Sequence, residues 1–465
     1  MRTPRAVATH LAALAAALIL GGCSSARPWL NEPLRPAEVV RYDGRAQFAD
    51  PARAADILVV ASFSGGGSRA AAFAHAALAE LDARAFAWQG RKTSLAHEID
   101  MVAGVSGGSV AAAHFALHGL RAHLARFPDD FLAVDFQSRL VGAALAPVNV
   151  NRMSSPWFGR GNVLAEELDA QLFAGATFGH LAALPGRPYL IVGATDLSNG
   201  AEFDFASDQF RTLCSSIDKV PLAFAVAASS SVPLVFSPLT LQNHSNACSA
   251  GAPGGLAAVR ADTARARLVQ SEVDSLAASD RRYVHLVDGG LSDNLGLRRI
   301  ADYVAQAGGI RPVLAALQRG GTEGAPLPRR IVFVSVNSER IAPLAVERRG
   351  EVPGTAEVLH AMVYGGLGRY SRETSLVFSD AVSEWRRELQ TAAASTPGAD
   401  VDIYAIEINL SDLEDRELRE RVLAIPTAFR ITPEDLELLR RAAHAGVAQS
   451  PELARFLAST QRNPD

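Results

Sequence analysis

A serine flanked by glycines is the first group in this chain that could act as a nucleophile. Ser106 stands at the centre of the pattern Gly104-x-Ser106-x-Gly108. A short apolar run, Ile99 to Ala103, predicts a buried strand before it, and an alanine-rich segment predicts a helix after it. A sharp strand-to-helix turn of this kind exposes the serine hydroxyl and needs glycines, because side chains would clash. The pattern is common, so an ordinary glycine- and serine-rich loop stays open as an alternative.

Three consecutive glycines upstream of the serine could stabilise a negative charge. Gly65, Gly66 and Gly67 follow an apolar strand, Asp56 to Phe63, and precede a helix expected from about residue 70 to residue 84. The N–H groups of such a loop and the helix dipole favour an anion. The spacing also fits a loose dinucleotide-binding fingerprint, but no second strand ending in an acidic residue follows at the required distance. The lysine of a phosphate-binding loop is missing too, whereas an oxyanion hole for the serine needs neither feature.

An aspartate far downstream is the third candidate group. Asp288 ends an apolar run that begins at Tyr283 and predicts a strand, and Gly289 and Gly290 follow it. An acid at a strand end, with glycines removing bulk beside it, is placed to accept a proton from a neighbouring side chain. The alternative is a simple Asp-Gly turn after a buried strand.

Taken in this order, the glycine loop, the G-x-S-x-G serine and the Asp-Gly-Gly acid resemble the patatin-like phospholipases. Residues 161–181, 189–196 and 227–233 are similar to further segments of that family. The resemblance covers about residues 56–340 and implies an α/β fold, a three-layer sandwich with a central, mostly parallel sheet flanked by helices. One residue departs from the family's pattern, because Ala70 stands where the oxyanion motif usually has glycine. Alanine suits the start of a helix.

The resemblance implies a serine acyl hydrolase that works through a Ser–Asp dyad without histidine. Ser106 would attack an ester carbonyl while Asp288 takes its proton, and water would then hydrolyse the acyl-enzyme. Backbone N–H groups of Gly65, Gly66 and Gly67, with the amide after the serine, would bind the oxyanion. The implied substrate is a lipid, above all a phospholipid or lysophospholipid. The supporting motif residues are Arg69, which either faces a headgroup or makes a structural ion pair, and Gly104, Gly108, Gly289 and Gly290.

Two other functions stay open. A Ser-His-Asp hydrolase would need a histidine partner downstream, where the candidates are His244, His285, His360 and His444. The last two lie in helix-like stretches, where a structural histidine is the simpler interpretation. A lipid-binding lipoprotein without catalysis could use the same fold, although it would have no reason to keep the serine, the aspartate and the glycine loop together.

No cofactor or metal is expected. The only weak metal candidate is the pair His114 and His118, whose spacing puts both rings on one face of the helix after Ser106. Phe115 follows His114, so the glutamate of a His-Glu-x-x-His zinc site is missing, and no clear third ligand stands out. We expect two histidines packed on a helix.

The first 22 residues predict an export signal. Two arginines give a positive start, and Leu11 to Leu20 is an apolar core too short to span a bilayer. The sequence Leu-Gly-Gly-Cys23 resembles the lipobox of bacterial lipoproteins, which implies cleavage before Cys23 and its lipidation; a plain secretory signal is the alternative. Ser24 after the cysteine resembles outer-membrane sorting in enterobacteria. We therefore expect a lipid-anchored protein of the bacterial cell envelope, on the outer membrane and facing the periplasm.

Charge and cysteine content fit an exported protein. The formal net charge of −4 argues against nucleic acid as a partner and against binding to anionic lipid by bulk charge. Once Cys23 is set aside, Cys214 and Cys248 remain as an even pair in an oxidising compartment. We predict a disulfide between them, with two independent buried thiols as the alternative.

These patterns divide the chain into a lipoprotein signal peptide (1–22), a polar tether (23–55), a patatin-like catalytic domain (56–340) and a C-terminal α/β extension packing on it (341–465). The extension is expected to be largely helical. Its first helix, residues 357–389, is expected to be interrupted by Gly365, Gly366 and Gly368. Residues 401–409 alternate like a half-buried edge strand, and Thr432 is expected to cap a helix that runs to about residue 445.

Overall fold

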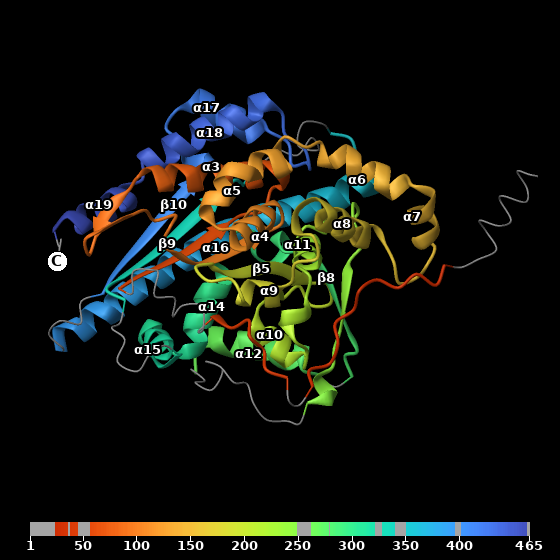
Figure 1. Cartoon of the computed structure of the whole chain (residues 1–465), viewed down its shortest axis with the longest axis horizontal. Coiled ribbons are helices and arrows are strands. Elements are labelled where there is room, and N and C mark those ends of the chain that lie inside the picture. Colours follow the sequence, from red (N-terminus) through yellow and green to blue (C-terminus); the bar gives the residue numbers. More distant parts are fainter. Residues whose placement is uncertain are drawn as a thin grey trace, which may run out of the picture.

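A mixed, mostly parallel sheet of eight strands runs through the middle of the molecule (Figure 1). The structure is a computed structural model that describes residues 24–35, 38–44, 56–248, 262–278, 280–320, 328–339, 350–395 and 401–462. The strands of the sheet are β1 (Ile57–Phe63), β4 (Ile99–Val105), β5 (Tyr189–Asp196), β6 (Glu202–Phe205), β7 (Leu239–Gln242), β8 (Tyr283–Asp288), β9 (Arg330–Asn337) and β10 (Asp402–Asn409). A separate hairpin is formed by β2 (Phe86–Trp88) and β3 (Arg91–Thr93).

Five strands are parallel, in the order β10, β9, β1, β4 and β5. The remaining strands are antiparallel: β6 and β8 pair with β5, and β7 pairs with β8. The parallel strands are covered on both faces, which explains why β1 and β9 read as nearly continuous apolar runs. The predicted α/β class with a central, mostly parallel sheet is confirmed.

The helices of the described chain are α3 (Gly67–Ala83), α4 (Gly107–His118), α5 (Leu120–Phe127), α6 (Phe136–Leu145), α7 (Pro147–Arg152), α8 (Arg160–Leu168), α9 (Phe178–Ala182), α10 (Ser207–Thr212), α11 (Leu222–Ser229), α12 (Ala264–Leu276), α13 (Gly290–Asp293), α14 (Arg298–Ala307), α15 (Ile310–Gly320), α16 (Thr355–Ser395), α17 (Arg416–Ala424), α18 (Pro433–Ala448) and α19 (Pro451–Arg462). A short π-helix follows each of α5 and α8, at Pro128–Leu132 and Asp169–Phe173.

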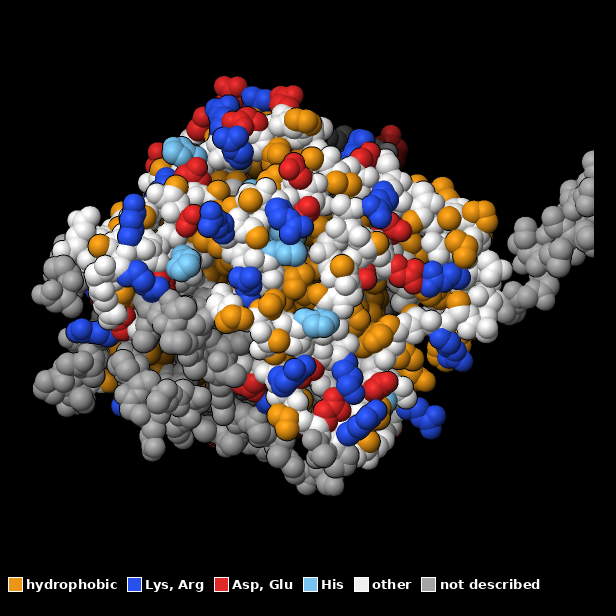
Figure 2. All heavy atoms as spheres, in the orientation of Figure 1, with side chains coloured by type: hydrophobic (Ala, Val, Ile, Leu, Met, Phe, Trp, Pro, Cys, Tyr) orange, Lys and Arg blue, Asp and Glu red, His pale blue; other side chains and the backbone are white. Residues whose placement is uncertain are grey.

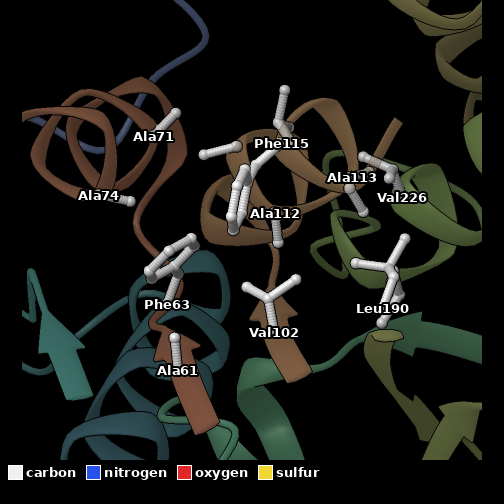
Figure 3. Close-up of a cluster of buried hydrophobic side chains, with 14 of the residues drawn as sticks. Ala61, Phe63, Ala71, Ala74, Val102, Ala112, Ala113, Phe115, Leu190 and Val226 are labelled. Carbon is white, nitrogen blue, oxygen red and sulfur yellow. The ribbon is translucent and has the colours of Figure 1, made fainter. Parts of the chain in front are cut away.

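One face of the sheet is covered by α3, α4 and α11 (Figure 3). Along β1, Ala61 and Phe63 point to this face, because alternate side chains of a strand lie on opposite sides. The helices contribute small residues to this contact: Ala71 and Ala74 on α3 and a run of alanines on α4. Small side chains let the two helices approach the strand ends closely, and those ends carry the glycine loop and Ser106.

The opposite face of the sheet packs against α14, α15 and α16. Val60 of β1 and Phe333 of β9 point there, and the Phe333 ring contacts Phe378 and Trp385 of α16 at centroid distances of 5.3 and 5.6 Å. The prediction that glycines interrupt α16 is wrong, since the helix runs unbroken from Thr355 to Ser395. A glycine inside a helix costs roughly 1 kcal/mol, which a helix of this length anchored by aromatic contacts tolerates.

The C-terminal part of the chain completes the central sheet. β10 pairs in parallel with β9 over its whole length and forms the predicted edge strand. The predicted cap of α18 is present, because the Thr432 hydroxyl accepts a hydrogen bond from the Asp435 N–H at 3.1 Å. This helix packs along α3 and buries Leu439 and Ala443 between them.

Residues 24–35 and 38–44 were predicted to be part of a polar tether. In the structure they pack against the body of the protein instead. The Trp29 ring contacts Phe224 at 4.8 Å, and Tyr42 is fully buried. The Tyr42 hydroxyl donates to the Leu190 carbonyl and accepts from the Leu190 N–H, at 2.9 and 2.6 Å. This segment looked like a linker because it is rich in charge and proline, and its two aromatic residues are too few to give a periodic pattern.

The predicted signal peptide and its lipidation site, Cys23, lie outside the described residues. Within the part of the chain that is described, no helix is both long enough and apolar enough to cross a membrane.

Candidate active site

Ser106 lies at the tip of a strained turn between β4 and α4. Its backbone has φ 49° and ψ −123°, in the region that favours glycine, and such strain is typical of residues held for chemistry. Two glycines after it are required by space. A Cβ atom on Gly107 would lie 2.0 Å from the Gly67 carbonyl oxygen, and one on Gly108 would lie 2.3 Å from that of Phe63. The turn therefore packs backbone against backbone on the glycine loop.

Ser106 and Asp288 are in direct contact, 182 residues apart in the sequence. The Ser106 Oγ donates a hydrogen bond to the Asp288 Oδ2 at 2.9 Å. The register of β5 explains this contact: β4 pairs Val105 with Gly193, and β8 pairs Asp288 with Ala194, the next residue of β5. β4 and β8 flank β5 on opposite sides and run in opposite directions. Their C-terminal ends therefore lie beside adjacent residues of β5.

Burial makes Asp288 a stronger base than an ordinary aspartate. The side chain is 6% exposed, and desolvation raises the pKa of Asp288 to about 6, against the opposing effect of hydrogen bonds from the Gly290 N–H and Ser106. The Gly290 N–H donates to Asp288 Oδ1 at 2.9 Å, which leaves Oδ2 directed at the serine. A Cβ on Gly289 would lie 2.2 Å from the Gly193 oxygen, so the Asp-Gly-Gly sequence is needed for this strand end to close on β5.

The glycine loop lies beside the serine. A Cβ on Gly65 would be 3.3 Å from the Ser106 Cβ, and Gly66 and Gly67 have φ of 142° and 62°, conformations that favour glycine. The three amides differ in one respect. The Gly65 N–H donates to the Asn294 carbonyl at 3.0 Å, whereas in the described part of the chain the Gly66 and Gly67 N–H groups have no acceptor. An oxyanion can therefore be bound by Gly66 and Gly67, together with the free first amides of α4.

Ser229, for which the sequence predicted no individual role, links the Ser106 turn to β5. Its hydroxyl accepts a hydrogen bond from the Ser106 N–H at 2.8 Å and donates to the Gly193 carbonyl at 2.6 Å. The Gly289 N–H donates to the Ser229 carbonyl, and the Asp288 N–H to that of Ser231. One short segment thus fixes both halves of the dyad. The available signal was the Ala-Ser-Ser-Ser stretch at 228–231, which lies in one of the similar segments.

Arg69 is buried behind the glycine loop. Its guanidinium donates to the carbonyls of Ser338 and Ile425, at 3.1 and 2.5 Å. The Ser68 N–H donates to the Ala428 carbonyl at 2.8 Å. These contacts link the glycine loop to the end of β9 and to the segment after α17. Arg69 therefore has a structural role and does not face a lipid headgroup.

The histidines considered for a triad bind elsewhere. His244 contacts the Asn31 carbonyl, His285 the Thr240 hydroxyl and His444 the Glu80 carboxylate. The side chain of His360 is outside the described residues. The His114 and His118 rings contact each other in a tilted arrangement, with centroids 4.4 Å apart. Among the described residues no group of three or more potential ligands is arranged to hold a metal ion.

The two remaining cysteines are joined. Cys214 and Cys248 form a disulfide with a Cα–Cα distance of 5.8 Å, which links the end of α10 to the segment after β7. It lies away from the dyad.

Comparisons with known proteins show the family of this chain. A family model described as "Patatin-like phospholipase" matches residues 61–300, which contain the glycine loop, Ser106 and Asp288. Among solved structures, the chain is similar to human GIVD cytosolic phospholipase A2, with 12% identity and a TM-score of 0.44 over 92% of this chain and 69% of that one. The same human enzyme in complex with methyl gamma-linolenyl fluorophosphonate gives 13% identity and a TM-score of 0.38 over 91% and 63%. Comparison with curated protein sequences gave no match. The family model spans more than half of the chain, which therefore belongs to the patatin-like phospholipases, a family of lipid acyl hydrolases.

Proposed function

We propose that this protein cleaves carboxylic esters of phospholipids or lysophospholipids through a Ser106–Asp288 dyad and an acyl-enzyme. The observation that carries the proposal is the 2.9 Å hydrogen bond from the Ser106 hydroxyl to the Asp288 carboxylate. In the first step the Ser106 Oγ attacks the ester carbonyl carbon and its proton passes to Asp288. The proton then goes to the leaving alkoxide, and the acyl group stays on the serine.

The negative charge that develops on the carbonyl oxygen would be stabilised by the Gly66 and Gly67 N–H groups and by the amide of Gly107. One such donor typically contributes about 10²–10³ to the rate. In the second step water attacks the acyl-enzyme while Asp288 again accepts a proton. A pKa raised to about 6 supports this role, because the carboxylate is ionised at neutral pH and still basic enough to take a proton.

A Ser-His-Asp mechanism is less well supported by the geometry. Asp288 binds Ser106 directly, whereas the rings of His244, His285 and His444 hydrogen-bond to groups other than these two residues. His444→Gln should leave hydrolysis of a chromogenic ester within about twofold of the unmodified protein, because that side chain is exposed and binds Glu80. A large loss would favour a histidine-dependent mechanism.

We also propose that the protein is a lipoprotein of the bacterial envelope, anchored through Cys23 on the outer membrane and facing the periplasm. The support is the lipobox-like sequence before Cys23. An anchor would hold the enzyme at its substrate. Mass spectrometry of the N-terminal peptide, expected to carry acyl groups on Cys23, tests this part independently of activity.

The central experiment is lipid mass spectrometry of phospholipid vesicles incubated with the purified protein. We expect release of fatty acid and lysophospholipid, abolished in Ser106→Ala and reduced about 10²–10⁴-fold in Asp288→Asn, which keeps the shape but removes the base. A fluorophosphonate probe should label the protein and fail to label Ser106→Ala. Folded protein that neither releases fatty acid nor reacts with the probe would instead be a lipid-binding lipoprotein without catalysis.

A further inference from the structure

Hydrophobic side chains are exposed together on α6, on α7 and in the segment that follows them. We call these residues the α6–α7 surface: Val141, Leu145, Val148, Val150 and Trp157. Leu145 is 71% exposed and Val148 64% exposed. Figure 2 shows hydrophobic side chains gathered at the end of the molecule where α7 lies. Exposed apolar residues that cluster in this way mark interaction sites, whereas single ones need no explanation.

The core does not require these side chains. α6 already buries Phe136 and Leu140 against the body of the protein, and Val141 and Leu145 lie one turn apart on its other side. α7 has no buried residue at all. The exposed valines and leucine of the two helices are therefore not part of the hydrophobic core of the described chain.

The α6–α7 surface lies beside the start of the described N-terminal segment, residues 24–35. The Ser24 N–H donates to the Ser154 hydroxyl at 3.2 Å, just after α7, and the guanidinium of Arg27 lies 4.1 Å over the Trp157 ring. Cys23, the proposed lipidation site, directly precedes Ser24 in the sequence. A lipid on Cys23 would start beside this surface.

The start of α6, the helix that carries part of this surface, is linked to the catalytic site. Phe136, at the start of α6, contacts Phe429 at a ring distance of 5.8 Å, and Phe236 contacts the same ring at 6.0 Å. The preceding residue, Ala428, accepts the Ser68 N–H and lies so close to Gly67 that a Cβ there would be 2.5 Å from the Ala428 oxygen. Two more exposed apolar side chains, Leu234 and Val235, precede Phe236. Contacts between apolar side chains, with Phe136 fully buried and Phe236 and Phe429 half-buried, thus connect α6 to the edge of the oxyanion loop.

Two arginines at this surface can reach the phosphates of a phospholipid membrane: Arg27, which lies over the exposed Trp157 ring, and Arg160. Arg139 and Arg152, on α6 and α7, form ion pairs with Glu167 and Glu166 at 2.8 and 2.5 Å, so their charges are already balanced. Arg160 is exposed and donates to the Leu234 carbonyl, between the two apolar groups. Arginine beside exposed valine, leucine and tryptophan is the composition of a surface that enters the headgroup region of a bilayer.

We propose that the α6–α7 surface, with Leu234 and Val235, inserts into the phospholipid membrane and holds the edge of the oxyanion loop close to it. The inference rests on the proposed function only in that the substrate is taken from the same membrane. Insertion of the apolar side chains would orient the enzyme, which a flexible lipid chain on Cys23 does not do by itself.

The first test measures insertion without catalysis. The full chain with Ser106→Ala is mixed with vesicles whose phosphatidylcholine carries bromine in its acyl chains, which quench tryptophan fluorescence on contact. We expect quenching that is largely lost in Trp157→Phe and in Leu145→Ser/Val148→Ser. The matched control is Leu268→Ser/Leu376→Ser, which removes two equally exposed leucines of α12 and α16 and should keep the quenching.

The second test measures what insertion does for activity. In the catalytically intact chain, Leu145→Ser/Val148→Ser should lower hydrolysis of vesicle phospholipid roughly tenfold while hydrolysis of a soluble short-chain ester stays within about twofold. Quenching that survives in both surface variants would overturn the proposal. The proposal would also be overturned if vesicles caused no quenching and light scattering showed a dimer that dissociates in Leu145→Ser/Val148→Ser. The surface would then bind a second copy of the chain. Loss of all hydrolysis with quenching intact would overturn the proposed function alone.

Discussion

At the scale of single residues, the chemistry depends on one carboxylate placed between two opposing demands. Asp288 must be buried to gain basicity, and it must be ionised to accept a proton. Desolvation raises its pKa, while the Gly290 N–H and the Ser106 hydroxyl favour its charged form. The outcome, a pKa of about 6, leaves the base ionised at neutral pH.

This pKa predicts the pH dependence of catalysis. Because only the deprotonated carboxylate can act as base, kcat/KM for a soluble ester should be flat above pH 7 and should fall about tenfold per pH unit below about 6. Initial rates between pH 5 and 8 provide the measurement, with circular dichroism as a control for folding. A rate that is constant across this range would contradict the role of Asp288.

A second residue-scale prediction concerns Gly107, which was not among the residues predicted to support the motif. Gly107→Ala should abolish hydrolysis, because the new Cβ would meet the Gly67 carbonyl oxygen at 2.0 Å and push the serine turn away from the glycine loop. Gly365→Ala is the matched control, since a Cβ there meets nothing within 4 Å. Equal activity of both variants in an ester assay would exclude close packing of turn and loop.

At the scale of elements, α3 and α4 are joined behind the active site by buried histidines. His123 of α5 lies between His114 of α4, at 3.1 Å, and His75 of α3, at 3.4 Å, and His114 also contacts Asp130 at 3.4 Å. Burial lowers the pKa of His75 and of His114 to about 4. The same two helices begin at the oxyanion loop and at Ser106, so this cluster helps to fix their relative position.

The cluster predicts acid sensitivity. The folded-state pKa values lie below the unfolded value of about 6.5, so the unfolded chain binds more protons and stability from these histidines is lost as pH falls from 6.5 towards 4. His75→Phe, which cannot be protonated, should lose less of its melting temperature than the unmodified protein between pH 6.5 and 4.5. Exposed His97 gives the control His97→Gln. Buried carboxyls such as Asp204, whose pKa is raised to about 7, act in the opposite direction, so the difference between variants is the decisive quantity.

At the scale of the whole molecule, the N-terminal segment and the disulfide meet at one place. The Leu34 N–H donates to the Cys214 carbonyl at 2.7 Å, and the Asn31 side chain donates to the Ser215 hydroxyl at 3.1 Å. Cys214 is fully buried and bonded to Cys248. Segments from residue 24 onward and up to residue 248 are thus fastened together beside α10.

Loss of this link should destabilise the protein as a whole. For a sequence separation of 34 residues, chain entropy predicts that Cys214→Ser/Cys248→Ser lowers the free energy of unfolding by about 3–4 kcal/mol. Denaturant unfolding measures this difference, and the unmodified protein in reductant should behave like the double variant. Ester hydrolysis of the folded variant should remain, because the disulfide is remote from the dyad. Equal stability with and without reductant would contradict the link.

What the sequence determined by itself is local. The strand–glycine–helix patterns around Gly65–Gly67 and Ser106 follow from backbone sterics and apolar periodicity within a few residues, and these could be recognised directly. The strand that ends at Asp288 could be recognised in the same way. Only the tertiary structure decided that Asp288 meets Ser106, because that depends on β8 running antiparallel to β5 and ending at Ala194. The roles of Ser229 and Arg69, and the packing of Tyr42, were likewise invisible, since each depends on contacts between segments more than a hundred residues apart.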